Sequence, residues 1–341
     1  MHHSQRKQDH LDITLQQDVA SALPTGLDSI RLRHCALPDI ALGDVDPVID
    51  FLGHRLATPL LISSMTGGSP AGGRINHNLA MAAQTRGVAL GLGSGRVALA
   101  EPDTLKTFDV RAIAPDIALY VNIGAVQLNY GLTQDDCRRL VDVLQADGLI
   151  LHLNPLQEAL QADGNTNFAG LLPKIAALCA TLPVPVMVKE VGWGLSGATA
   201  AALATAGVAA LDVAGAGGTS WSEVERHRAD SAAAHDIALP FRDWGLTTVE
   251  SLIEAVAICP QLPIIASGGI RTGVDALKCL ALGARLVGMA GALLPAANQS
   301  AAAVEAAIDS FTAQLRVAMF ATGVANLTSV DASILQRASH D

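Results

Sequence analysis

The sequence predicts an α/β fold, a (β/α)8 TIM barrel with an N-terminal arm, and three observations support this prediction. Short apolar segments alternate with longer segments of helical periodicity from Pro59 onward. Aromatic residues make up only 3% of the chain, so its hydrophobic bulk comes from Ala, Val, Leu and Ile, which suits helices packed on a parallel sheet. Glycines and polar residues recur directly after the apolar segments, where the strands of such a barrel open onto the active-site face.

The elements follow in order along the chain. Residues 1–55 are the most polar part, and residues 28–50 show turn residues with little helical periodicity, which indicates extended segments and loops. The predicted strands span residues 60–63, 88–92, 117–121, 149–151, 184–188, 210–213, 264–266 and 286–289. The predicted helices span residues 74–86, 133–146 (with Thr133 as N-cap), 169–181, 196–206, 247–257, 273–282 and 301–320. The assignment between the second and third strands is loose, and an insertion runs from residue 221 to residue 245.

No linker or low-complexity segment interrupts this alternation. We therefore expect residues 1–341 to form a single TIM-barrel domain with right-handed crossovers. Residues 1–55 form the N-terminal arm and the extended segments, and we expect them to contribute to the site at the barrel mouth.

Composition excludes several classes of function. The formal net charge of -10 argues against non-specific binding to nucleic acid, although a few local Arg and Lys residues can still bind phosphate. The 5 cysteines are dispersed without a C-x-x-C pair, which indicates reduced thiols rather than a disulfide framework. Neither a signal peptide nor an apolar run long enough to span a bilayer is evident. We expect a soluble cytoplasmic protein with no membrane insertion.

The segment from Gly148 to Glu158 concentrates chemically useful side chains. The short apolar run 149–151 is typical of a buried strand, and polar residues follow it at once. His152 offers a general acid or base, Asn154 and Gln157 offer amides, and Glu158 offers a carboxylate that could bind a metal ion. An ordinary polar loop leaving the core is an equally open interpretation of these residues alone.

Glycine-rich segments follow the last three predicted strands. They are Gly217-Gly218-Thr219-Ser220, Ser267-Gly268-Gly269 and Ala290-Gly291. Loops after the last strands of TIM barrels often bind phosphate, because bare backbone N–H groups can approach the oxygens closely. Their joint position predicts a phosphate-binding site, whereas one such loop alone would be a weak signal.

Lys189 and the N-terminal basic residues each have two alternative roles that the sequence pattern does not distinguish. Lys189 ends an apolar strand, so its ammonium requires either a protein carboxylate or an electron-rich ligand. A lysine beside the N1–C2=O edge of a flavin would stabilise the reduced flavin, and a Schiff-base lysine is the rival interpretation. Arg6, Lys7 and His10 form either a solvated N-terminal tail or an arm that folds over an anionic ligand.

Several motifs together make a family resemblance specific. They are Arg6-Lys7 with His10, Ser63-Ser64-Met65-Thr66-Gly67-Gly68, Asn122, His152-x-Asn154-x-x-Gln157-Glu158, Lys189-Glu190-Val191-Gly192, Gly217-Gly218-Thr219-Ser220-Trp221, Phe241-x-x-Trp244-Gly245 and Ser267-Gly268-Gly269-Ile270-Arg271. The sequence resembles the type 2 isopentenyl-diphosphate isomerases, an FMN-dependent family, along nearly its full length. The glycine loops occur in many FMN barrels, whereas the Arg-Lys start and the His-Asn-Gln-Glu cluster are more particular to this family.

The resemblance implies a reaction and a set of ligands. Isopentenyl diphosphate is converted to dimethylallyl diphosphate over reduced FMN with Mg2+, and NADPH commonly supplies the reduction. The implied FMN-binding residues are Ser64, Met65, Thr66, Ser94, Asn122, Lys189 and Thr219, with Gly268, Gly269, Arg271, Ala290 and Gly291 around the phosphate. The implied substrate-binding residues are Arg6, Lys7, His10, Ser94, Arg96, His152, Asn154 and Gln157.

Further roles follow from the same resemblance. His152 and Gln157 are the candidate catalytic residues, and Glu158 is the candidate Mg2+ ligand. The family's habit of forming tetramers or octamers, together with the Ala-rich segment 301–320, suggests a homo-oligomer. The sequence departs from the family pattern at Gly95, where a Gln is usual, and in residues 164–168, where an Asp-Arg style charged residue is typical. Both departures concern substrate affinity.

Other functions fit the residues less well. A flavin-dependent 2-hydroxy-acid oxidase or dehydrogenase needs a late strand-end His-Arg pair, and residues 261–266 before Arg271 contain no His. A nucleotide dehydrogenase with a catalytic Cys is disfavoured because no Cys falls at a predicted strand end. A flavin-binding barrel without catalysis remains an alternative, against which the complete cluster from His152 to Glu158 argues.

Overall fold

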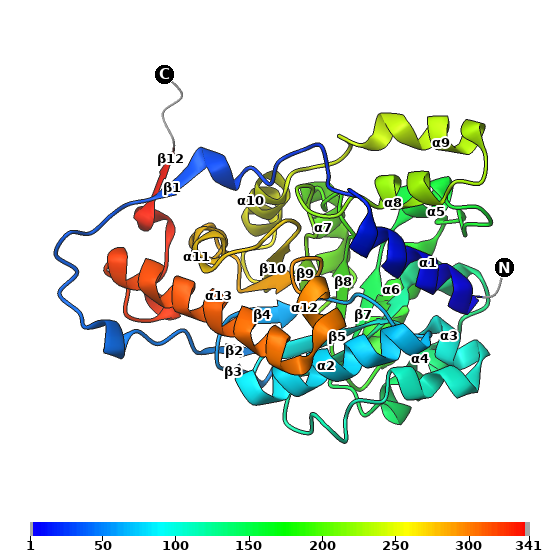
Figure 1. The fold of residues 1–341 in the computed structure, drawn as a ribbon, viewed down its shortest axis with the longest axis horizontal. Coiled ribbons are helices and arrows are strands. Elements are labelled where there is room, and N and C mark those ends of the chain that lie inside the picture. Colours follow the sequence, from blue (N-terminus) through cyan, green and yellow to red (C-terminus); the bar gives the residue numbers. More distant parts are fainter. Residues whose placement is uncertain (1–2, 338–341) are drawn as a thin grey trace.

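Eight parallel strands form a closed barrel, in the order β10-β11-β4-β5-β6-β7-β8-β9 (Figure 1). The computed structural model describes residues 3–337. The strands are β4 (Leu60–Ile62), β5 (Ala89–Ser94), β6 (Leu119–Gly124), β7 (Gly148–His152), β8 (Val186–Lys189), β9 (Ala210–Asp212), β10 (Ile264–Ser267) and β11 (Leu286–Met289). Each predicted strand overlaps one of these, so the predicted fold class is confirmed.

The predicted helices lie outside the barrel (Figure 1). They are α2 (Pro70–Arg86), α4 (Gln134–Val143), α6 (Leu171–Thr181), α7 (Gly197–Thr205), α10 (Thr248–Ile258), α11 (Gly273–Ala281) and α13 (Ala301–Ala321). Thr133 caps α4 as predicted, because its hydroxyl accepts a hydrogen bond from the Asp136 N–H at 3.1 Å. Helix α2 begins before the predicted residue 74, since Ser69 caps it and Pro70 occupies its first turn.

Shorter helices fill the segments that the sequence left undefined. Helix α3 (Arg96–Ala100) and the 3-10 helix η3 (Pro102–Thr107) lie between β5 and β6. The insertion after β9 contains α8 (Trp221–Arg228), α9 (Ala232–Ala238) and η5 (Leu239–Phe241), and α12 (Leu294–Gln299) follows β11. Among helices in the described part of the chain, none is both long and apolar enough to span a membrane.

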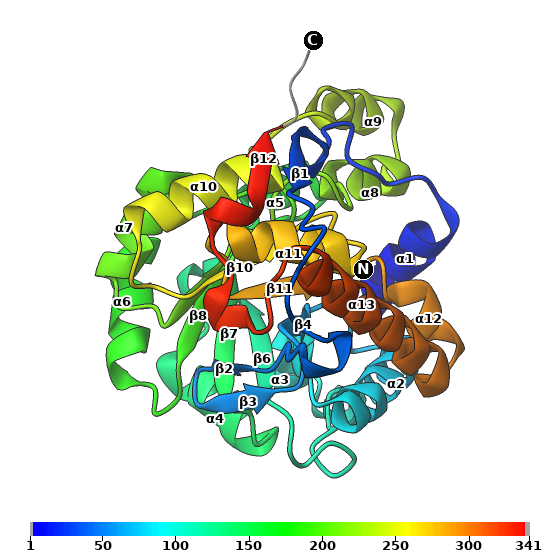
Figure 2. The same cartoon turned by 90° about the vertical axis from the view of Figure 1, so that its left-hand side faces the viewer.

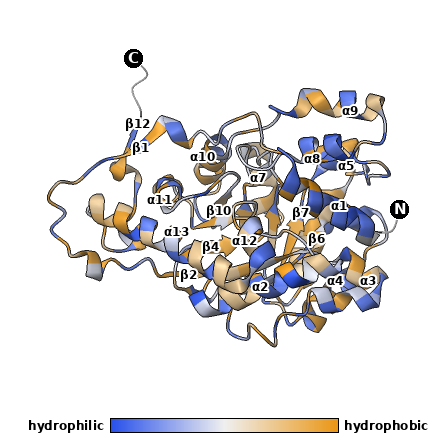
Figure 3. Cartoon of the chain, in the orientation of Figure 1, coloured by the Kyte–Doolittle hydropathy of each residue, from blue (hydrophilic) through white to orange (hydrophobic). Residues whose placement is uncertain are grey.

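Two hydrophobic layers stabilise the fold. One lies between the strands and the outer helices, and the other fills the barrel with inward side chains such as Leu61, Tyr120, Ile150 and Met187. Figure 3 shows hydrophobic residues along β6 and β7 and a mixture of both kinds on outer helices such as α2. This division follows from burial, because parallel strands are covered on both faces whereas each helix keeps one face in water.

The amino end of the barrel is covered by an antiparallel hairpin. Strands β2 (Ile49–Phe51) and β3 (His54–Leu56) pair with each other, and Ile49, Phe51 and Leu56 pack against the inner layer. Strand β1 (Ile30–Leu32) pairs antiparallel with β12 (Leu335–Arg337), and both small sheets are visible in Figure 2. The short, extended elements predicted for residues 28–50 agree with this arrangement.

The first residues correct a prediction. The described residues 3–16 form helix α1 (His3–Gln16), so the interpretation of this segment as a solvated tail is wrong. Side-chain hydrogen bonds one turn apart, from Gln5 to Asp9 and from Gln8 to Asp12, support the helix. The helix buries Leu11, which is 6% exposed, and packs against α8 and α2. Figure 1 shows α1 next to α8, at the end of the barrel away from the β2–β3 hairpin.

Candidate functional site

The inward side chains of the barrel change from apolar to polar within two residues at its carboxyl end. Inside β7, Ile150 is followed by His152, and inside β8, Met187 is followed by Lys189. Inward positions alternate with outward ones along each strand, so each of these polar residues lies one layer above an apolar neighbour. The result is a polar layer on top of a hydrophobic core.

A cavity of about 330 Å³ opens above this layer. All of the predicted site residues line it: Arg6, Lys7, His10, Ser64, Met65, Thr66, Ser94, Arg96, Asn122, His152, Asn154, Gln157, Glu158, Lys189, Thr219, Gly268, Gly269, Arg271, Ala290 and Gly291. The cavity is within the size range of cofactor and substrate pockets. The structure thus brings these residues together, while the role of each stays a prediction.

His152 is held as a neutral side chain. Its Nδ1 donates a hydrogen bond to Asn122 Oδ1 at 2.7 Å, which leaves Nε2 without a proton in the neutral ring. Burial, together with the positive charges of Lys189 and Lys7, lowers the pKa of His152 to about 3. At neutral pH, His152 therefore presents an uncharged ring to the cavity.

The residues after His152 form helix α5 (Pro155–Leu160) rather than an ordinary polar loop, so that alternative is wrong. The Asn154 amide donates to Gln157 Oε1 and to Glu158 Oε1, both at 3.1 Å. The other Glu158 oxygen accepts the Asn165 N–H at 2.6 Å. Asn154 Oδ1 is buried without a hydrogen-bond partner in the described structure. A buried acceptor of this kind is costly unless a ligand or water satisfies it.

Helix α1 inserts cations at the rim of the cavity. The Lys7 ammonium donates to the Ser94 carbonyl at 2.6 Å and lies 5.2 Å from the centre of the Phe108 ring. Burial, together with the neighbouring Arg6 charge, lowers the pKa of Lys7 to about 7. Burial also lowers the pKa of Arg6, which the Glu158 carboxylate opposes. Closely spaced cations at a cavity favour an anionic ligand.

The sequence analysis missed Glu225, a buried carboxylate on α8. Its Oε1 accepts a hydrogen bond from His10 at 3.0 Å and from the Gln157 amide at 3.3 Å. Burial raises the pKa of Glu225, but the hydrogen bond and charge of His10 and the charge of Arg228 outweigh it, so its pKa lies below the usual value. Trp221 packs edge-on against His10 with ring centroids 5.2 Å apart. Glu225 lies one helical turn after Trp221, and that spacing was the signal available in the sequence.

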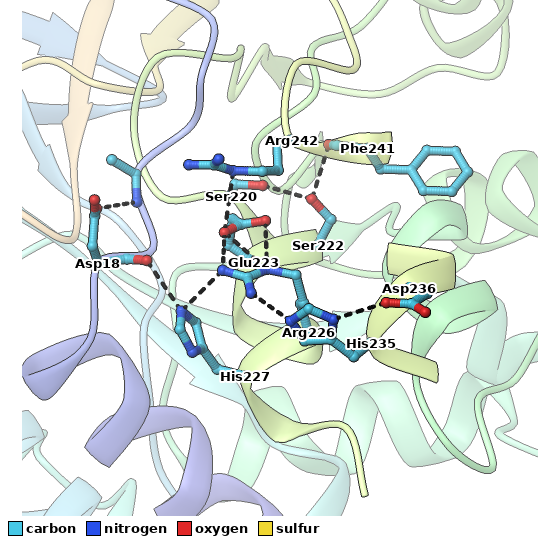
Figure 4. Close-up of polar contacts among 11 residues, drawn as sticks. Asp18, Ser220, Ser222, Glu223, Arg226, His227, His235, Asp236, Phe241 and Arg242 are labelled. Carbon is cyan, nitrogen blue, oxygen red and sulfur yellow. Dashed lines mark hydrogen bonds and ion pairs between the residues drawn. The ribbon is translucent and has the colours of Figure 1, made fainter. Parts of the chain in front are cut away.

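A second carboxylate anchors α8 on its other side, as Figure 4 shows. Glu223 has 1% of its side chain exposed and forms ion pairs with Arg226 of the same helix at 2.6 Å and with Arg242 at 3.3 Å. The Ser222 hydroxyl donates to the Phe241 carbonyl at 2.9 Å. The contacts with Phe241 and Arg242 fasten α8 to the end of the insertion and so fix the helix that carries Trp221 and Glu225.

Lys189 has a partner that the sequence did not predict. Its ammonium donates to the carbonyl oxygen of Glu190, so this hydrogen-bond partner is a backbone carbonyl rather than a carboxylate side chain. The Glu190 carboxylate instead accepts the backbone N–H groups of Val191, Gly192 and Trp193 at 2.6, 2.8 and 2.7 Å. Burial raises the pKa of Glu190 to about 7, although these hydrogen bonds act to lower it. The turn after β8 is thereby fixed around the lysine.

The glycine loops form a bare backbone wall of the cavity. Gly268 and Gly269 have φ angles of 103° and 73°, which favour glycine. A Cβ at Gly268 would lie 2.0 Å from the Gly215 carbonyl oxygen, and one at Gly269 would lie 2.3 Å from that of Gly217. Only glycine fits where these two loops meet, and both glycines line the cavity.

Comparison with known proteins identifies the family. A model of the FMN-dependent dehydrogenase family matches residues 152–337. An isopentenyl-diphosphate delta-isomerase of a Synechococcus strain is 54% identical over 319 residues, which is 93% of this chain and 92% of that protein. The chain belongs to the type 2, FMN-dependent isopentenyl-diphosphate delta-isomerases. The corresponding enzyme of Rickettsia felis is 50% identical and covers 94% of this chain and 92% of its own length.

Solved structures extend the likeness of the fold. A variant of flavocytochrome b2 with sulfite bound has a TM-score of 0.70 at 17% identity, covering 97% of this chain and 83% of that one. A chimera of (S)-mandelate dehydrogenase has a TM-score of 0.67 at 16% identity, covering 97% of this chain and 99% of that one. At such low identity these structures show the barrel fold alone. The predicted isomerase family is confirmed over the 2-hydroxy-acid oxidase or dehydrogenase alternative.

The residues present fit an FMN cofactor. The Ser64 hydroxyl oxygen is buried without a hydrogen-bond partner in the part of the chain that is described. Gly268, Gly269, Ala290 and Gly291 line the same cavity, where a phosphate would contact their backbone. Lys189 adds a positive charge to the same cavity. An unsatisfied hydroxyl, glycine loops and a cation match what a flavin phosphate and its ring require.

One departure from the family pattern has a local explanation. A Cβ at Gly95 would lie 2.8 Å from Leu140 Cδ2, so the usual Gln would require Leu140 to move. Arg96, the next residue, still lines the cavity. The structure gives no comparable account of residues 164–168.

Proposed function

We infer that this protein interconverts isopentenyl diphosphate and dimethylallyl diphosphate at the mouth of the barrel. The observation that carries this inference is that one cavity is lined by three features. They are the cations of α1, the buried amide–carboxylate cluster after His152 and the glycine loops. The identity of 54% to an isopentenyl-diphosphate delta-isomerase over 93% of the chain supports it. The reaction moves a double bond by adding one proton and removing another.

The polar layer and the glycine wall hold FMN in this proposal. Ser64, Met65, Thr66, Ser94, Asn122, Lys189 and Thr219 bind the ring and its side chain, and Gly268, Gly269, Arg271, Ala290 and Gly291 surround the phosphate. When bound and reduced, FMN supplies an electron-rich ring that stabilises cationic character in the alkene and can exchange a proton. Lys189 contributes positive charge toward that ring, and α1 limits the access of water to it.

The cationic rim grips the diphosphate. Arg6, Lys7 and Arg96 supply charge, and His10, Ser94, His152 and Asn154 complete the set of substrate-binding residues in the same cavity. The arm within residues 1–55 thus contributes to the substrate site through α1. Binding of the head group far from the alkene orients the five-carbon tail over the polar layer.

Glu158 is the proposed Mg2+ ligand. Mg2+ usually takes one or two carboxylates, substrate phosphate oxygens and several waters rather than an all-protein cage. No group of three or more His, Cys, Asp or Glu residues in the described chain is arranged to hold a metal ion. The unsatisfied Asn154 Oδ1 lies in the same cluster as the Glu158 carboxylate, so both would offer oxygen atoms to a hydrated Mg2+ ion.

Gln157 orients one of the two exchanged protons. Its amide is fixed at both ends, because Oε1 accepts from Asn154 and Nε2 donates to Glu225. A fixed amide can align a proton donor without itself changing charge. His152, neutral through burial, assists by presenting Nε2 to the cavity. NADPH as reductant, a tetrameric or octameric homo-oligomer and a cytoplasmic location belong to the same proposal.

The test is to purify the protein and reconstitute it with FMN. We expect a yellow flavin spectrum and, under anaerobic conditions with Mg2+ and NADPH, conversion of isopentenyl diphosphate to dimethylallyl diphosphate. Lactate and mandelate serve as substrates for the alternative activity, and we expect no oxidation of either. Protein that cannot bind FMN, or flavin-loaded protein that leaves isopentenyl diphosphate unchanged, would refute the proposed function.

A further inference from the structure

Gln127 is a buried amide in the wall of the cavity to which the proposed function gives no role. It lies in the 3-10 helix η4 (Ala125–Asn129), directly after β6, and is 5% exposed. Its carbonyl accepts the N–H groups of Tyr130 and Leu132 at 2.8 and 3.1 Å, which fixes its backbone. No residue within 3–337 forms a hydrogen bond with its side-chain amide, and neither amide atom is enclosed by protein. An amide in this position requires a ligand or a water as its partner.

The position of β6 separates Gln127 from the glycine loops. In the closed barrel, β6 is four strands from β10 in either direction, so Gln127 lies on the wall opposite Gly268 and Gly269. Those glycines belong to the proposed site of the FMN phosphate. The strand next to β6 is β5, which carries Ser94, and the Ser94 carbonyl accepts a hydrogen bond from the Lys7 ammonium at 2.6 Å. Gln127 therefore lies on the side of the cavity where α1 inserts its cations.

His152 lies on the same wall but cannot donate a hydrogen bond into the cavity. Gly124 on β6 pairs with His152, and a Cβ at Gly124 would lie 3.0 Å from His152 Nε2 and 3.7 Å from Gln127 Cγ. The imidazole and the amide therefore flank the same end of β6. In the neutral ring, Nδ1 donates to Asn122 and Nε2 carries only a lone pair. An ionised diphosphate oxygen is also an acceptor, so a donor beside His152 has to come from another residue, and Gln127 offers two N–H bonds.

We propose that Gln127 is a further substrate-binding residue, whose amide N–H groups donate to the diphosphate head group on the side of the cavity shared by Lys7 and His152. The inference rests on the proposed function, because it takes the diphosphate of the substrate as the ligand. A neutral donor adds hydrogen bonds to the anion without the cost of burying another charge. Because the backbone of Gln127 is fixed, its amide also orients the head group, which the charges of flexible side chains do less well.

The test is Gln127→Met, which keeps the length of the side chain and removes both N–H donors. We expect inorganic diphosphate to bind about tenfold more weakly, because the lost hydrogen bonds are to a charged group. Calorimetry near pH 7, with and without FMN, measures this affinity. Fluorescence titration should show an unchanged affinity for FMN, because the proposed FMN phosphate site lies across the barrel. With isopentenyl diphosphate, KM should rise while kcat changes little, since the head group is bound alike in the ground state and the transition state.

A second variant and a matched control complete the design. Gln127→Glu replaces the donors by a carboxylate of the same length. The cations of α1 favour its ionised form, and repulsion between like charges should weaken diphosphate binding about 100-fold. The control is Gln134→Glu, which adds the same charge at an exposed position in the first turn of α4, outside the cavity. The new carboxylate can still accept the Thr181 hydroxyl, which Gln134 accepts at 3.1 Å, so we expect no change of affinity.

The outcomes separate this inference from the proposed function. An unchanged diphosphate affinity in Gln127→Met, or in Gln127→Glu where the first variant does not fold, shows that only water satisfies the amide and overturns the inference alone. Equal losses of FMN and diphosphate affinity indicate a structural role and overturn it as well. Wild-type protein that binds diphosphate through Gln127 but leaves isopentenyl diphosphate unchanged refutes the proposed function and keeps the anion site. Wild-type protein that does not bind diphosphate overturns both.

Discussion

The two ends of the barrel are built from the same strands but are occupied differently. At the amino end, Phe51 and Leu56 of the β2–β3 hairpin complete a hydrophobic layer around Tyr120 and Ile150. Two residues further along β7, at the carboxyl end, His152 faces a polar cavity closed by α1. The difference shows that stability and chemistry are separated along the barrel axis: the lower layers hold the strands together and the top layer is free to carry polar groups.

The largest expected effect is at the amino end. Phe51 is 2% exposed, and Phe51→Ala should lower the free energy of unfolding by about 3–5 kcal/mol through lost burial and an added cavity. The kcat of the folded fraction should stay unchanged, because Phe51 is far from the mouth. Urea unfolding and steady-state kinetics measure the two quantities, with Phe51→Leu as a milder control. A loss of stability below about 1 kcal/mol would contradict the division between the ends.

At the carboxyl end, Gln157→Ala should lower kcat and leave stability nearly unchanged, which is the reverse of the result expected for Phe51→Ala. We expect kcat to fall about 100-fold, because a proton loses its oriented amide, while FMN stays bound and stability changes little. Flavin absorbance and isomerase assays measure both. Gln84→Ala, which removes an exposed amide on α2 bonded to Asp116, is the matched control with no expected effect on kcat. Unchanged turnover would remove Gln157 from the mechanism.

The pH dependence of anion binding tests the rim. Burial lowers the pKa of Lys7 from 10.5 to about 7, so the ligand-free protein loses this charge as pH rises through about 7. A bound diphosphate restores the pKa, and affinity should therefore fall above pH 7 by up to about tenfold per pH unit. In the ligand-free protein the unfolded chain binds the extra proton between these pKa values, so this group's contribution to stability rises with pH across that window.

Calorimetry with inorganic diphosphate measures this dependence. Lys7→Met should bind more weakly below pH 7 and lose the extra dependence above it. Subtracting its profile from that of the wild type cancels the titration of diphosphate itself. Identical profiles for the two proteins would show that Lys7 does not contact the anion.

The smallest expected effect concerns a polar residue at the carboxyl end that lies outside the cavity. It tests whether such a residue contributes to stability alone. Thr133 caps α4 and is bonded to Asp136, and Thr133→Ala should cost about 1 kcal/mol of stability without any change in kcat. Thermal unfolding and the isomerase assay measure the two effects, and Thr133→Ser should restore the stability. A reduced kcat in a fully folded Thr133→Ala protein would extend the functional region beyond the cavity.

The contrast between the two ends of the barrel explains which parts of the site could be predicted from the sequence. His152 and Lys189 follow apolar runs, and the carboxyl ends of parallel strands meet at one end of a barrel, so their proximity followed from the pattern. Glu225 could not be assigned in this way. It lies within an insertion, and its position depends on how α8 is anchored through Glu223 to Arg242 and through Ser222 to Phe241.

Local pattern also failed where packing decided the structure. The segment from Arg6 to Leu11 is polar enough for a solvated tail, yet it forms a helix because Leu11 is buried and α8 and α2 are available to pack against. The residues after His152 likewise form helix α5 instead of a loop. Short helices of this kind gain most of their stability from tertiary contacts rather than from intrinsic propensity.

The sequence by itself determined the barrel, its strand order along the chain, the family and the set of residues at the strand ends, because periodicity and glycine placement are local properties. Only the tertiary structure decided which charged side chains are buried and which groups lie next to them. The neutral state of His152, the lowered pKa of Lys7 and the unsatisfied oxygen of Asp212 all depend on burial and on neighbours from other strands and helices. Desolvation and long-range charge are set by three-dimensional proximity, which the order of residues does not specify.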